Sequence, residues 1–186
     1  MKTPIVIIAA LESELNSKSL GKNIPVVFSG IGKVNAAIAT FRAIQRYEPK
    51  LILNFGTVGR INPAVSGLVQ VSKVIQRDMI AEPLAPRGTV PFSSKPHEYL
   101  SGEVGCICGT GDSFVIHQDE WLIRNQVDVV DMELFAIASV AHEFGIAWKA
   151  YKFISDDANE ESGHEWQKKV NHGEELVLKK LEGLAP

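Results

Sequence analysis

Hydrophobic residues in this chain follow two alternating patterns: short uninterrupted runs, and stretches in which they recur every three or four positions. Short, mostly apolar runs occupy Pro4–Ala10, Pro25–Ser29, Leu51–Phe55 and Gly105–Cys108, and two strand candidates interrupted by polar residues occupy Val69–Ile75 and Trp148–Ile154. Short runs of this kind are typical of strands buried on both faces of a sheet. Gly56 and Gly59 follow the third run, and we expect them to end that strand.

Helical spacing marks three further segments. The first helix begins after the Gly30–Gly32 turn and ends before Pro49. Its apolar positions are Val34, Ala37, Ile38, Phe41 and Ile44. The second helix is closed by Gly145 as a C-cap. Its apolar face consists of Leu134, Ile137, Ala138, Ala141 and Phe144. The third is an amphipathic terminal helix over 162–183.

Residues 81–101 follow neither pattern, and four prolines and Gly88 in this stretch predict a loop without regular structure. A loop of this length inside a compact domain is usually functional or mobile. The remaining segments alternate strands with helices, which predicts a single α/β domain over 1–186 with helices on both faces of a central sheet. Ligands of such sheets bind beyond the carboxyl ends of the strands.

Composition excludes several classes of protein. The 186 residues suit one domain, and 19 Lys and Arg against 22 Asp and Glu give a formal net charge of -3, which argues against a nucleic-acid-binding domain. The run at Ile5–Ala10 is too short to cross a membrane and has no signal-peptide cleavage site. Cys106 and Cys108 suit small buried thiols in a reducing cytoplasm. The five histidines lack metal-binding spacing, so no metal is expected.

The predicted strand ends carry acidic or glycine residues. Glu12 and Glu14 follow the first strand, and Asp156 and Asp157 follow the last. Each pair has an ordinary structural explanation, as first-turn helix acids or as turn-forming aspartates. Ser29–Lys33 is glycine-rich but lacks the phosphate-loop spacing, and there is no GxSxG nucleophile elbow. Their joint occurrence nevertheless predicts an acid/base site around an apolar pocket.

Six motifs, in order and covering most of the chain, resemble those of the nucleoside phosphorylase/nucleosidase superfamily. The most similar group is the 5'-methylthioadenosine/S-adenosylhomocysteine nucleosidases. The motifs are Ala10–Leu15, Ser29–Ala37, Asn54–Gly59, Gly111–Val115, Val130–Ala138 and Ile154–Asn159. The resemblance implies a three-layer α/β fold whose central mixed sheet partly closes into a barrel. It also implies cleavage of the N-glycosidic bond of a purine nucleoside, without a cofactor.

The resemblance also implies roles for individual residues. Glu14 matches the acid that activates the attacking water, and Asp156 matches the acid that protonates the leaving base. Burial and the neighbouring Asp157 are expected to raise the pKa of Asp156. The expected substrate-binding residues are Leu11, Thr57, Gly59, Phe114, Val115, Met132, Glu133 and Trp166. Among these, Phe114 stacks on the base and Glu133 binds the ribose hydroxyls. Family members are usually dimers, so a homodimer is expected, with 81–101 as its candidate contributor.

Alternatives to hydrolysis remain open at this point. Phosphorylases of the superfamily carry an arginine where this chain has Asn54, and acids at the first loop would repel phosphate, which favours water. Lys33 and Arg60 keep phosphorolysis as an alternative. The chain is shorter than is usual for the family, and Arg60 replaces a small residue, so a futalosine-type nucleoside is a second possible substrate. A non-catalytic nucleoside-binding protein is disfavoured by the retained acids.

Overall fold

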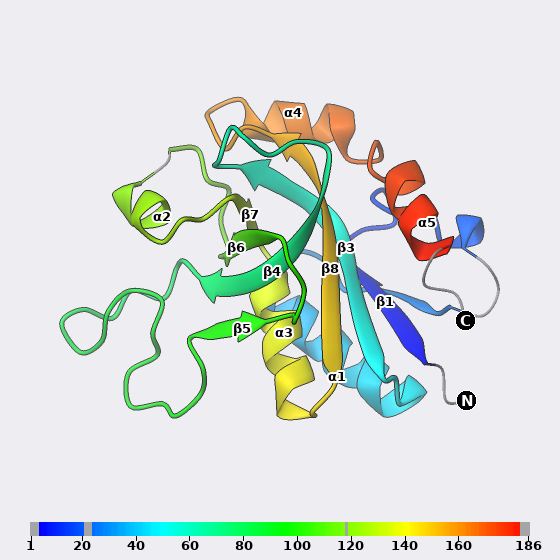
Figure 1. The fold of residues 1–186 in the computed structure, drawn as a ribbon, viewed down its shortest axis with the longest axis horizontal. Helices are drawn as coiled ribbons and strands as arrows, with labels where there is room; N and C mark the ends of the chain where they lie inside the picture. The colour runs from blue at the N-terminus through cyan, green and yellow to red at the C-terminus, as the bar shows by residue number, and fades with distance from the viewer. Residues whose placement is uncertain (1–3, 21–23, 118, 183–186) are drawn as a thin grey trace.

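Eight strands form one mixed sheet in the computed structural model, which describes residues 4–20, 24–117 and 119–182 (Figure 1). The strands are β1 (Ile5–Ala9), β2 (Val26–Phe28), β3 (Leu51–Arg60), β4 (Leu68–Gln76), β5 (Glu98–Leu100), β6 (Cys106–Thr110), β7 (Val129–Asp131) and β8 (Ala147–Asp156). The helices are η1 (Ser17–Ser19), α1 (Lys33–Tyr47), α2 (Glu120–Arg124), α3 (Leu134–Glu143), α4 (Ser162–Lys169) and α5 (Glu174–Glu182).

Five of these strands close into a ring. Going around it, β3 pairs with β7, β7 with β6, β6 with β4, β4 with β8, and β8 with β3 again. Strands β1 and β2 extend the sheet from β3, and β5 extends it from β4. The ring mixes parallel and antiparallel pairs, so the expectation of a mixed, partly barrel-like sheet flanked by helices is confirmed.

Helices pack against both faces of the sheet at β1, because this strand is apolar on both of its faces. Val6 and Ile8 point into a core that contains the inner faces of α1 and α3. Ile7 and Ala9 point into a second core, which Val177 of α5 completes. In Figure 1, α1 and α3 lie in the lower part of the view and α5 lies at its right-hand side. The uninterrupted apolar run therefore has the cause that the sequence predicts, burial of both faces.

One edge of β3 is shared by two strands that do not meet. Strand β1 runs parallel to β3 and pairs with it as far as Asn54. Strand β7 runs antiparallel and begins pairing at Gly59. Between these two residues the edge of β3 has no partner strand, while β8 pairs with its other edge throughout. This gap is where the pocket described below opens.

The expectation that Gly56 and Gly59 end the third strand is wrong. β3 continues through both to Arg60, with Gly56 opposite Lys152 and Gly59 opposite Asp156. Both glycines allow a carboxylate to come close to the backbone of β3, and they do not end the strand. A Cβ on Gly56 would lie 3.3 Å from a carboxylate oxygen of Glu14, and one on Gly59 only 2.8 Å from Asp156 Oδ1.

Only part of the apolar stripe predicted for α1 meets the core: Ile44 is buried and Ala37 packs against the core, whereas Val34, Ile38 and Phe41 are exposed. The buried positions of the helix are Ala36, Thr40, Ala43 and Ile44. Mostly small residues let α1 pack closely on α3, and the Thr40 hydroxyl donates to the Ala36 carbonyl within the helix. Phe144, expected on the inner face of the second helix, is also largely exposed, and its ring lies 5.8 Å from that of Phe41.

The predicted terminal helix is two helices, α4 and α5, separated by a turn; residue 183 lies outside the described residues. Gly173 explains the break. A Cβ there would lie 2.5 Å from the Cβ of Phe153, so the chain comes too close to β8 for a continuous helix with side chains at that point. Gly145 follows α3 with a positive φ of 64°, in agreement with the predicted C-cap.

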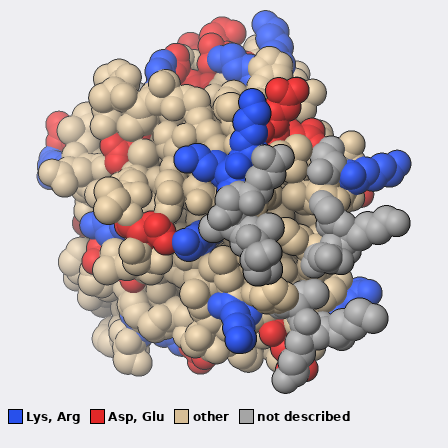
Figure 2. All heavy atoms as spheres, turned by 45° about the vertical axis from the view of Figure 1, so that its right-hand side comes forward, with Lys and Arg blue, Asp and Glu red and all other residues tan. Residues whose placement is uncertain are grey.

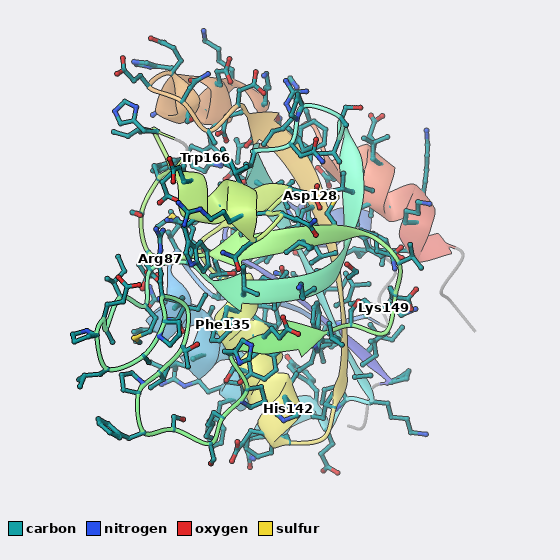
Figure 3. All side chains as sticks on the ribbon, turned by 60° about the vertical axis from the view of Figure 1, so that its left-hand side comes forward. Arg87, Asp128, Phe135, His142, Lys149 and Trp166 are labelled. Atoms are coloured by element: carbon teal, nitrogen blue, oxygen red, sulfur yellow. The ribbon has the colours of Figure 1, made fainter. Side chains whose placement is uncertain are left out.

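The stretch 81–101 contains one element that the proline pattern does not predict. β5 pairs antiparallel with β4, and its Tyr99 is buried against Phe135 and His142 of α3 (Figure 3). The Tyr99 hydroxyl donates to Ser139. A single aromatic residue with a partner for its hydroxyl thus fixes a strand of three residues. The sequence pattern does not predict the short elements η1 and α2 either.

The surface carries charges of both signs. On the face drawn in Figure 2, Lys and Arg side chains lie interspersed with Asp and Glu. Among the helices of the described ranges, none has both the length and the apolar character needed to cross a membrane. Cys106 and Cys108 are both buried and unbridged, as the sequence predicts for small core thiols.

Candidate active site

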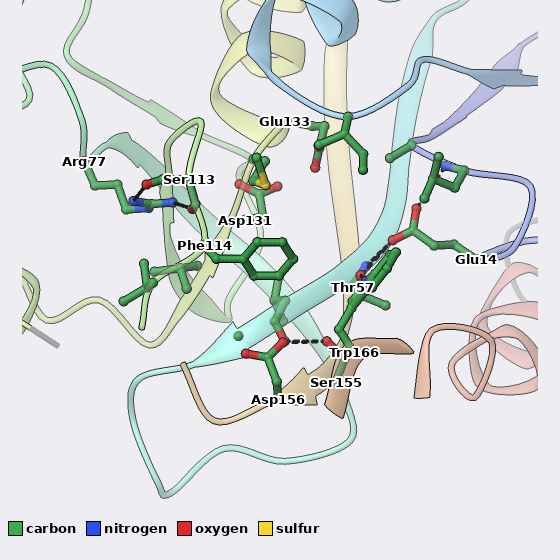
Figure 4. Close-up of a pocket in the computed structure, with 18 residues that line it drawn as sticks. Glu14, Thr57, Arg77, Ser113, Phe114, Asp131, Glu133, Ser155, Asp156 and Trp166 are labelled. Carbon is green, nitrogen blue, oxygen red and sulfur yellow. Dashed lines mark hydrogen bonds between the residues drawn. The ribbon is translucent and has the colours of Figure 1, made fainter. Parts of the chain in front are cut away.

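All ten site residues expected from the sequence line one pocket, although they come from six separate segments of the chain (Figure 4). The pocket lies at the gap in the β3 edge and holds about 560 Å³ of empty space, counted to its open mouth. The expected residues are Leu11, Glu14, Thr57, Gly59, Phe114, Val115, Met132, Glu133, Asp156 and Trp166.

Glu14 fills the gap in the β3 edge. The chain makes a tight turn after β1, and the side chain of Glu14, 4% exposed, returns toward the sheet. Its Oε1 accepts hydrogen bonds from the Thr57 amide at 2.9 Å and the Thr57 hydroxyl at 2.8 Å. Its Oε2 accepts one from the Leu11 amide at 3.1 Å. Neither Glu14 nor the exposed Glu12 lies in the first turn of a helix, so that explanation is excluded.

Trp166 continues this hydrogen-bonded chain. Its indole N–H donates to the Thr57 hydroxyl at 2.9 Å, while the same hydroxyl donates to Glu14. Trp166 belongs to α4, so this chain ties the helix to the carboxylate across the pocket (Figure 4). The sequence predicts only an apolar contact for Trp166; the indole N–H adds a polar one.

Glu133 lies at the N-cap of α3 and is 8% exposed. Its Oε1 accepts a hydrogen bond from the Gly32 amide, at the start of α1, at 2.9 Å. Burial and then the nearby charge of Asp131 raise the pKa of Glu133 to about 7. Because this carboxyl titrates near neutral pH, its environment works against the charged form, which is the arrangement expected of a functional carboxyl.

Beneath the pocket, Asp131 and Lys152 form a fully buried ion pair of 2.7 Å. Asp131 also accepts hydrogen bonds from the Thr110 hydroxyl and the Leu134 amide. Burial opposes the charge on both partners, but their mutual attraction lowers the pKa of Asp131 and raises that of Lys152 above its ordinary value. The pair is therefore ionised, and Lys152 compensates the acids of the pocket.

Asp156 ends β8 at the opposite side of the pocket and is 5% exposed. Its Oδ1 accepts a hydrogen bond from the Ala158 amide, and its Oδ2 lies 2.8 Å from the Ser155 hydroxyl. The carboxylate of the neighbouring Asp157 forms an ion pair with Arg60 at 2.6 Å. Gly59 leaves the space that Asp156 occupies.

Phe114 and Val115 follow the turn after β6 and form one wall. Phe114 is 51% exposed, and its ring lies edge-on to Trp166, with 6.4 Å between ring centroids. In Figure 4 the Phe114 ring lies between Asp156 on one side and Glu133 on the other. An aromatic ring in this position is suited to stack on a planar ligand.

Sequence patterns assign no role to several residues of the site. Arg77 and Ser155 line the pocket, and Lys152 lies under it. Lys152 carries a weak signal in the sequence, because it and Lys149 interrupt the apolar residues of Trp148–Ile154. Within the part of the chain that the structure describes, no group of three or more His, Cys, Asp or Glu side chains is arranged to hold a metal ion.

The model of the phosphorylase superfamily matches residues 14–184, nearly the whole chain. The chain belongs to the phosphorylase superfamily. A 5'-methylthioadenosine/S-adenosylhomocysteine nucleosidase of Shewanella halifaxensis is 33% identical over 166 residues, which cover 76% of this chain and 72% of the relative. Within the superfamily the chain therefore falls among these nucleosidases.

Two solved structures share the superfamily fold of this chain. The native futalosine hydrolase of Helicobacter pylori superimposes with a TM-score of 0.86 at 21% identity, over 97% of this chain and 96% of that one. The 5'-methylthioadenosine/S-adenosylhomocysteine nucleosidase of the same species, with butyl-thio-DADMe-Immucillin-A, gives 0.83 at 20% identity, over 98% and 97%. At these identities the likeness concerns the fold alone.

The raised pKa of Glu133 predicts a cost in stability at neutral pH. Its folded-state pKa of about 7 lies above the ordinary 4.5, so its contribution to stability is complete below about pH 4.5 and is lost as the pH rises through 7. Glu133→Gln keeps the neutral form at every pH. In urea unfolding, the free energy of unfolding of the variant minus that of the wild type should increase by about 3 kcal/mol between about pH 4.5 and about pH 8.

Glu12→Gln is the matched control, because Glu12 is exposed. Its free energy of unfolding should follow the wild type over the same pH range. If the difference in free energy of unfolding between Glu133→Gln and the wild type does not change with pH, the raised pKa of Glu133 is contradicted.

Proposed function

We propose that this nucleosidase hydrolyses the N-glycosidic bond of a 5'-methylthioadenosine- or S-adenosylhomocysteine-like nucleoside and releases adenine. The observation that carries the proposal is the placement of three buried carboxyls, Glu14, Glu133 and Asp156, around one pocket with an aromatic wall. A glycosidic bond needs help at both ends, because the sugar becomes cationic while the base leaves with the electron pair.

Glu14 is assigned as the base that activates the attacking water. Its two oxygens already accept three hydrogen bonds from donors that hold the carboxylate in one orientation. An ionised carboxylate is an acceptor only, so this donor set fits the form that can take a proton from water. Thr57, supported by Trp166, keeps one of these donors in place.

Glu133 is assigned to the ribose hydroxyls, with the backbone of Met132 beside it. When ionised, Glu133 also lies where a positive charge on the sugar would develop. Because its pKa is raised to about 7, the arrival of such a cation would favour the ionised form.

Asp156 is assigned as the acid that donates a proton to the leaving purine. The Ser155 hydroxyl lies 2.8 Å from Asp156 Oδ2 and 3.3 Å from the Val58 carbonyl oxygen. A hydroxyl carries one proton and donates to only one of these acceptors at a time. The shorter contact, in which the Ser155 hydroxyl donates to Asp156 Oδ2, holds this carboxyl at the wall of the pocket.

Water is favoured over phosphate as the nucleophile because carboxylates already occupy the donors that an anion would use. The Gly32 amide binds Glu133, and the Thr57 amide binds Glu14. The two cations that kept phosphorolysis open are paired elsewhere, Lys33 with Asp78 and Arg60 with Asp157. A phosphate would meet negative charge without a free cation at these positions.

An apolar 5'-substituent fits the other end of the pocket. Leu11, Ile31 and Trp166 line it, and a hydrogen bond from the Gly30 amide to the Ala10 carbonyl holds Ile31 beside Leu11. These side chains suit a thioether with little polarity. A cytoplasmic location accords with the buried thiols and stays a prediction.

Loss of the Glu14 carboxylate tests the proposed function. We expect the wild type to release free adenine from 5'-methylthioadenosine equally well with and without phosphate. In Glu14→Gln, kcat should fall by about 10²-fold or more, because the amide cannot accept the proton from water. Chromatographic detection of adenine is the measurement, with S-adenosylhomocysteine and futalosine assayed in parallel.

Glu12→Gln serves as the control for Glu14→Gln, since Glu12 is two residues away and exposed. Its rate should match the wild type within about twofold. Strict dependence of the wild type on phosphate would establish a phosphorylase instead. Binding of the nucleosides with no cleavage would establish a non-catalytic nucleoside-binding protein.

Asp156→Asn tests the acid. The variant retains a hydrogen-bond donor but cannot transfer a proton, so adenine nucleosides should be cleaved at least about 10²-fold more slowly. A nitrophenyl riboside, whose leaving group needs no proton, should lose far less. The measurement is the ratio of the two rates in wild type and variant; an equal drop on both substrates would mean that Asp156 only organises the site.

We further propose that the protein is a homodimer that buries the outward face of α1. The exposed Val34, Ile38 and Phe41 form an apolar stripe on α1, and Phe144 of α3 lies against it. The stripe begins three residues after Ile31, which lines the pocket. A second copy of the chain seated there would cover apolar surface and close the pocket mouth, and Phe92 of the 81–101 loop, 95% exposed, is a candidate to reach it.

Ile38→Glu combined with Phe41→Glu tests the dimer. Charges on this stripe should convert the wild-type dimer to a monomer in analytical ultracentrifugation and reduce kcat/KM by about tenfold or more, because the pocket loses one wall. Val104→Glu, which introduces a charge at another exposed apolar residue, should remain dimeric. A wild type that sediments as an active monomer would contradict the proposal.

A further inference from the structure

Arg77 is a buried cation that makes no salt bridge with an Asp or Glu in the described ranges. It follows β4 directly, is 6% exposed and lines the pocket. Its Nε donates to the Gly109 carbonyl at 3.2 Å, and one terminal nitrogen donates to the Ser113 hydroxyl at 3.1 Å. The other terminal nitrogen donates to the carbonyls of Gly111, at 2.9 Å, and of Ser113. All four bonds end on one segment, Gly109–Ser113.

This segment leads directly into the aromatic wall of the pocket. Phe114 and Val115 follow it, and Phe114 is too exposed for packing alone to fix its ring. Gly111 gives the guanidinium its access, since a Cβ there would lie 2.9 Å from Arg77 Cζ. The adjacent Asp78 accepts the Asp112 amide at 2.8 Å, so two consecutive residues after β4 hold consecutive residues of the turn.

The clamp that Arg77 places on Gly109–Ser113 also sets the direction of backbone donors. In a trans peptide the carbonyl and the following N–H point to opposite sides. Because the Ser113 carbonyl points to Arg77, the Phe114 N–H points away from it. Within the described residues, the amides of Phe114 and Val115 have no intramolecular acceptor. They are therefore free to donate to the acceptor nitrogens of a purine beside the Phe114 ring.

The free-energy cost of burying the Arg77 guanidinium favours a functional role for this residue. Burial lowers the pKa of Arg77, and no carboxylate of the described residues compensates it through a hydrogen bond. A buried charge of this kind is costly, and an apolar side chain would fill the same space without that cost. What an apolar residue cannot do is bind three carbonyls and a hydroxyl at once, as the planar guanidinium does.

We propose that Arg77 is a positioning residue for recognition of the base: it holds Ser113–Val115 so that the Phe114 ring and the free amides face the purine. This role rests on the proposed function, because it takes the base to bind at this wall. Arg77 takes no part in breaking the glycosidic bond. The backbone of Arg77 also contacts the surface loop, because Arg87 donates a hydrogen bond to the Arg77 carbonyl and its guanidinium lies over the Trp121 ring.

Arg77→Lys tests the proposal, because lysine keeps the charge but cannot reach four acceptors. We expect the dissociation constant for free adenine, measured by calorimetry, to rise by at least about tenfold. With 5'-methylthioadenosine as substrate, KM should rise by a similar factor, while kcat at saturation should stay within about threefold of the wild type. Arg124→Lys, at an exposed arginine of α2, should leave all three quantities unchanged.

An unchanged affinity for adenine would overturn the proposal, and so would a fall in kcat as large as the rise in KM. If Arg77→Lys does not fold, Ser113→Ala removes one of the four contacts and should weaken adenine binding about two- to threefold at an unchanged melting temperature. No change in that variant counts equally against the clamp. Adenine binding that depends on Arg77 in a wild type that cleaves no nucleoside would refute the proposed function and leave this inference standing.

Discussion

The site depends on one feature of the backbone, the unpaired edge of β3 between Asn54 and Gly59. Strand β1 leaves this edge and β7 joins it in the opposite direction, so the amide of Thr57 has no strand to bind. A buried amide without an acceptor is costly, and Glu14 supplies one. The Asn54 side chain donates to the Ile8 carbonyl and closes the other side of the gap. The same divergence that opens a pocket thus also fixes a carboxylate inside it.

The concentration of acids around that gap is tolerated because a buried cation lies beneath it. Glu133, Asp131 and Asp156 line the same pocket as Glu14, and Lys152 of β8 forms an ion pair with Asp131. Burial and then the charge of Asp131 raise the pKa of Glu133 to about 7, and the cation of Lys152 offsets this only in part. A domain selected for stability alone would not keep this arrangement, because a buried carboxyl at neutral pH opposes folding. The residues make sense as machinery for a reaction that develops positive charge.

The sequence predicts features that depend on neighbouring residues better than features that depend on contacts between distant segments. The strands buried on both faces, the C-cap at Gly145 and the ten pocket residues follow from local patterns or from motifs. Arg77 and Lys152 do not, because their partners Gly111 and Asp131 lie 34 and 21 residues away. The sequence does not predict that β3 continues through Gly56, and the reason is again a contact with a distant segment. A glycine in a strand signals either an end or a close approach, and only the position of Glu14 decides between them.

The exposed apolar stripe of α1 is another feature that depends on contacts the sequence pattern does not reveal, and it lies next to the site. Periodicity identifies an apolar face on a helix but not what covers it, and Phe41, which belongs to the predicted apolar positions of α1, lies at the surface. The first turn of that helix is nevertheless part of the pocket, because the Gly32 amide binds Glu133 and the Lys33 amide binds Asp112. Whatever packs on α1 therefore constrains the backbone that holds Glu133 on one side and the turn bearing Phe114 on the other. The proposed ribose and base ends of the site meet at the start of one helix, and the exposed apolar face of that helix is the one that a second copy would cover in the proposed dimer.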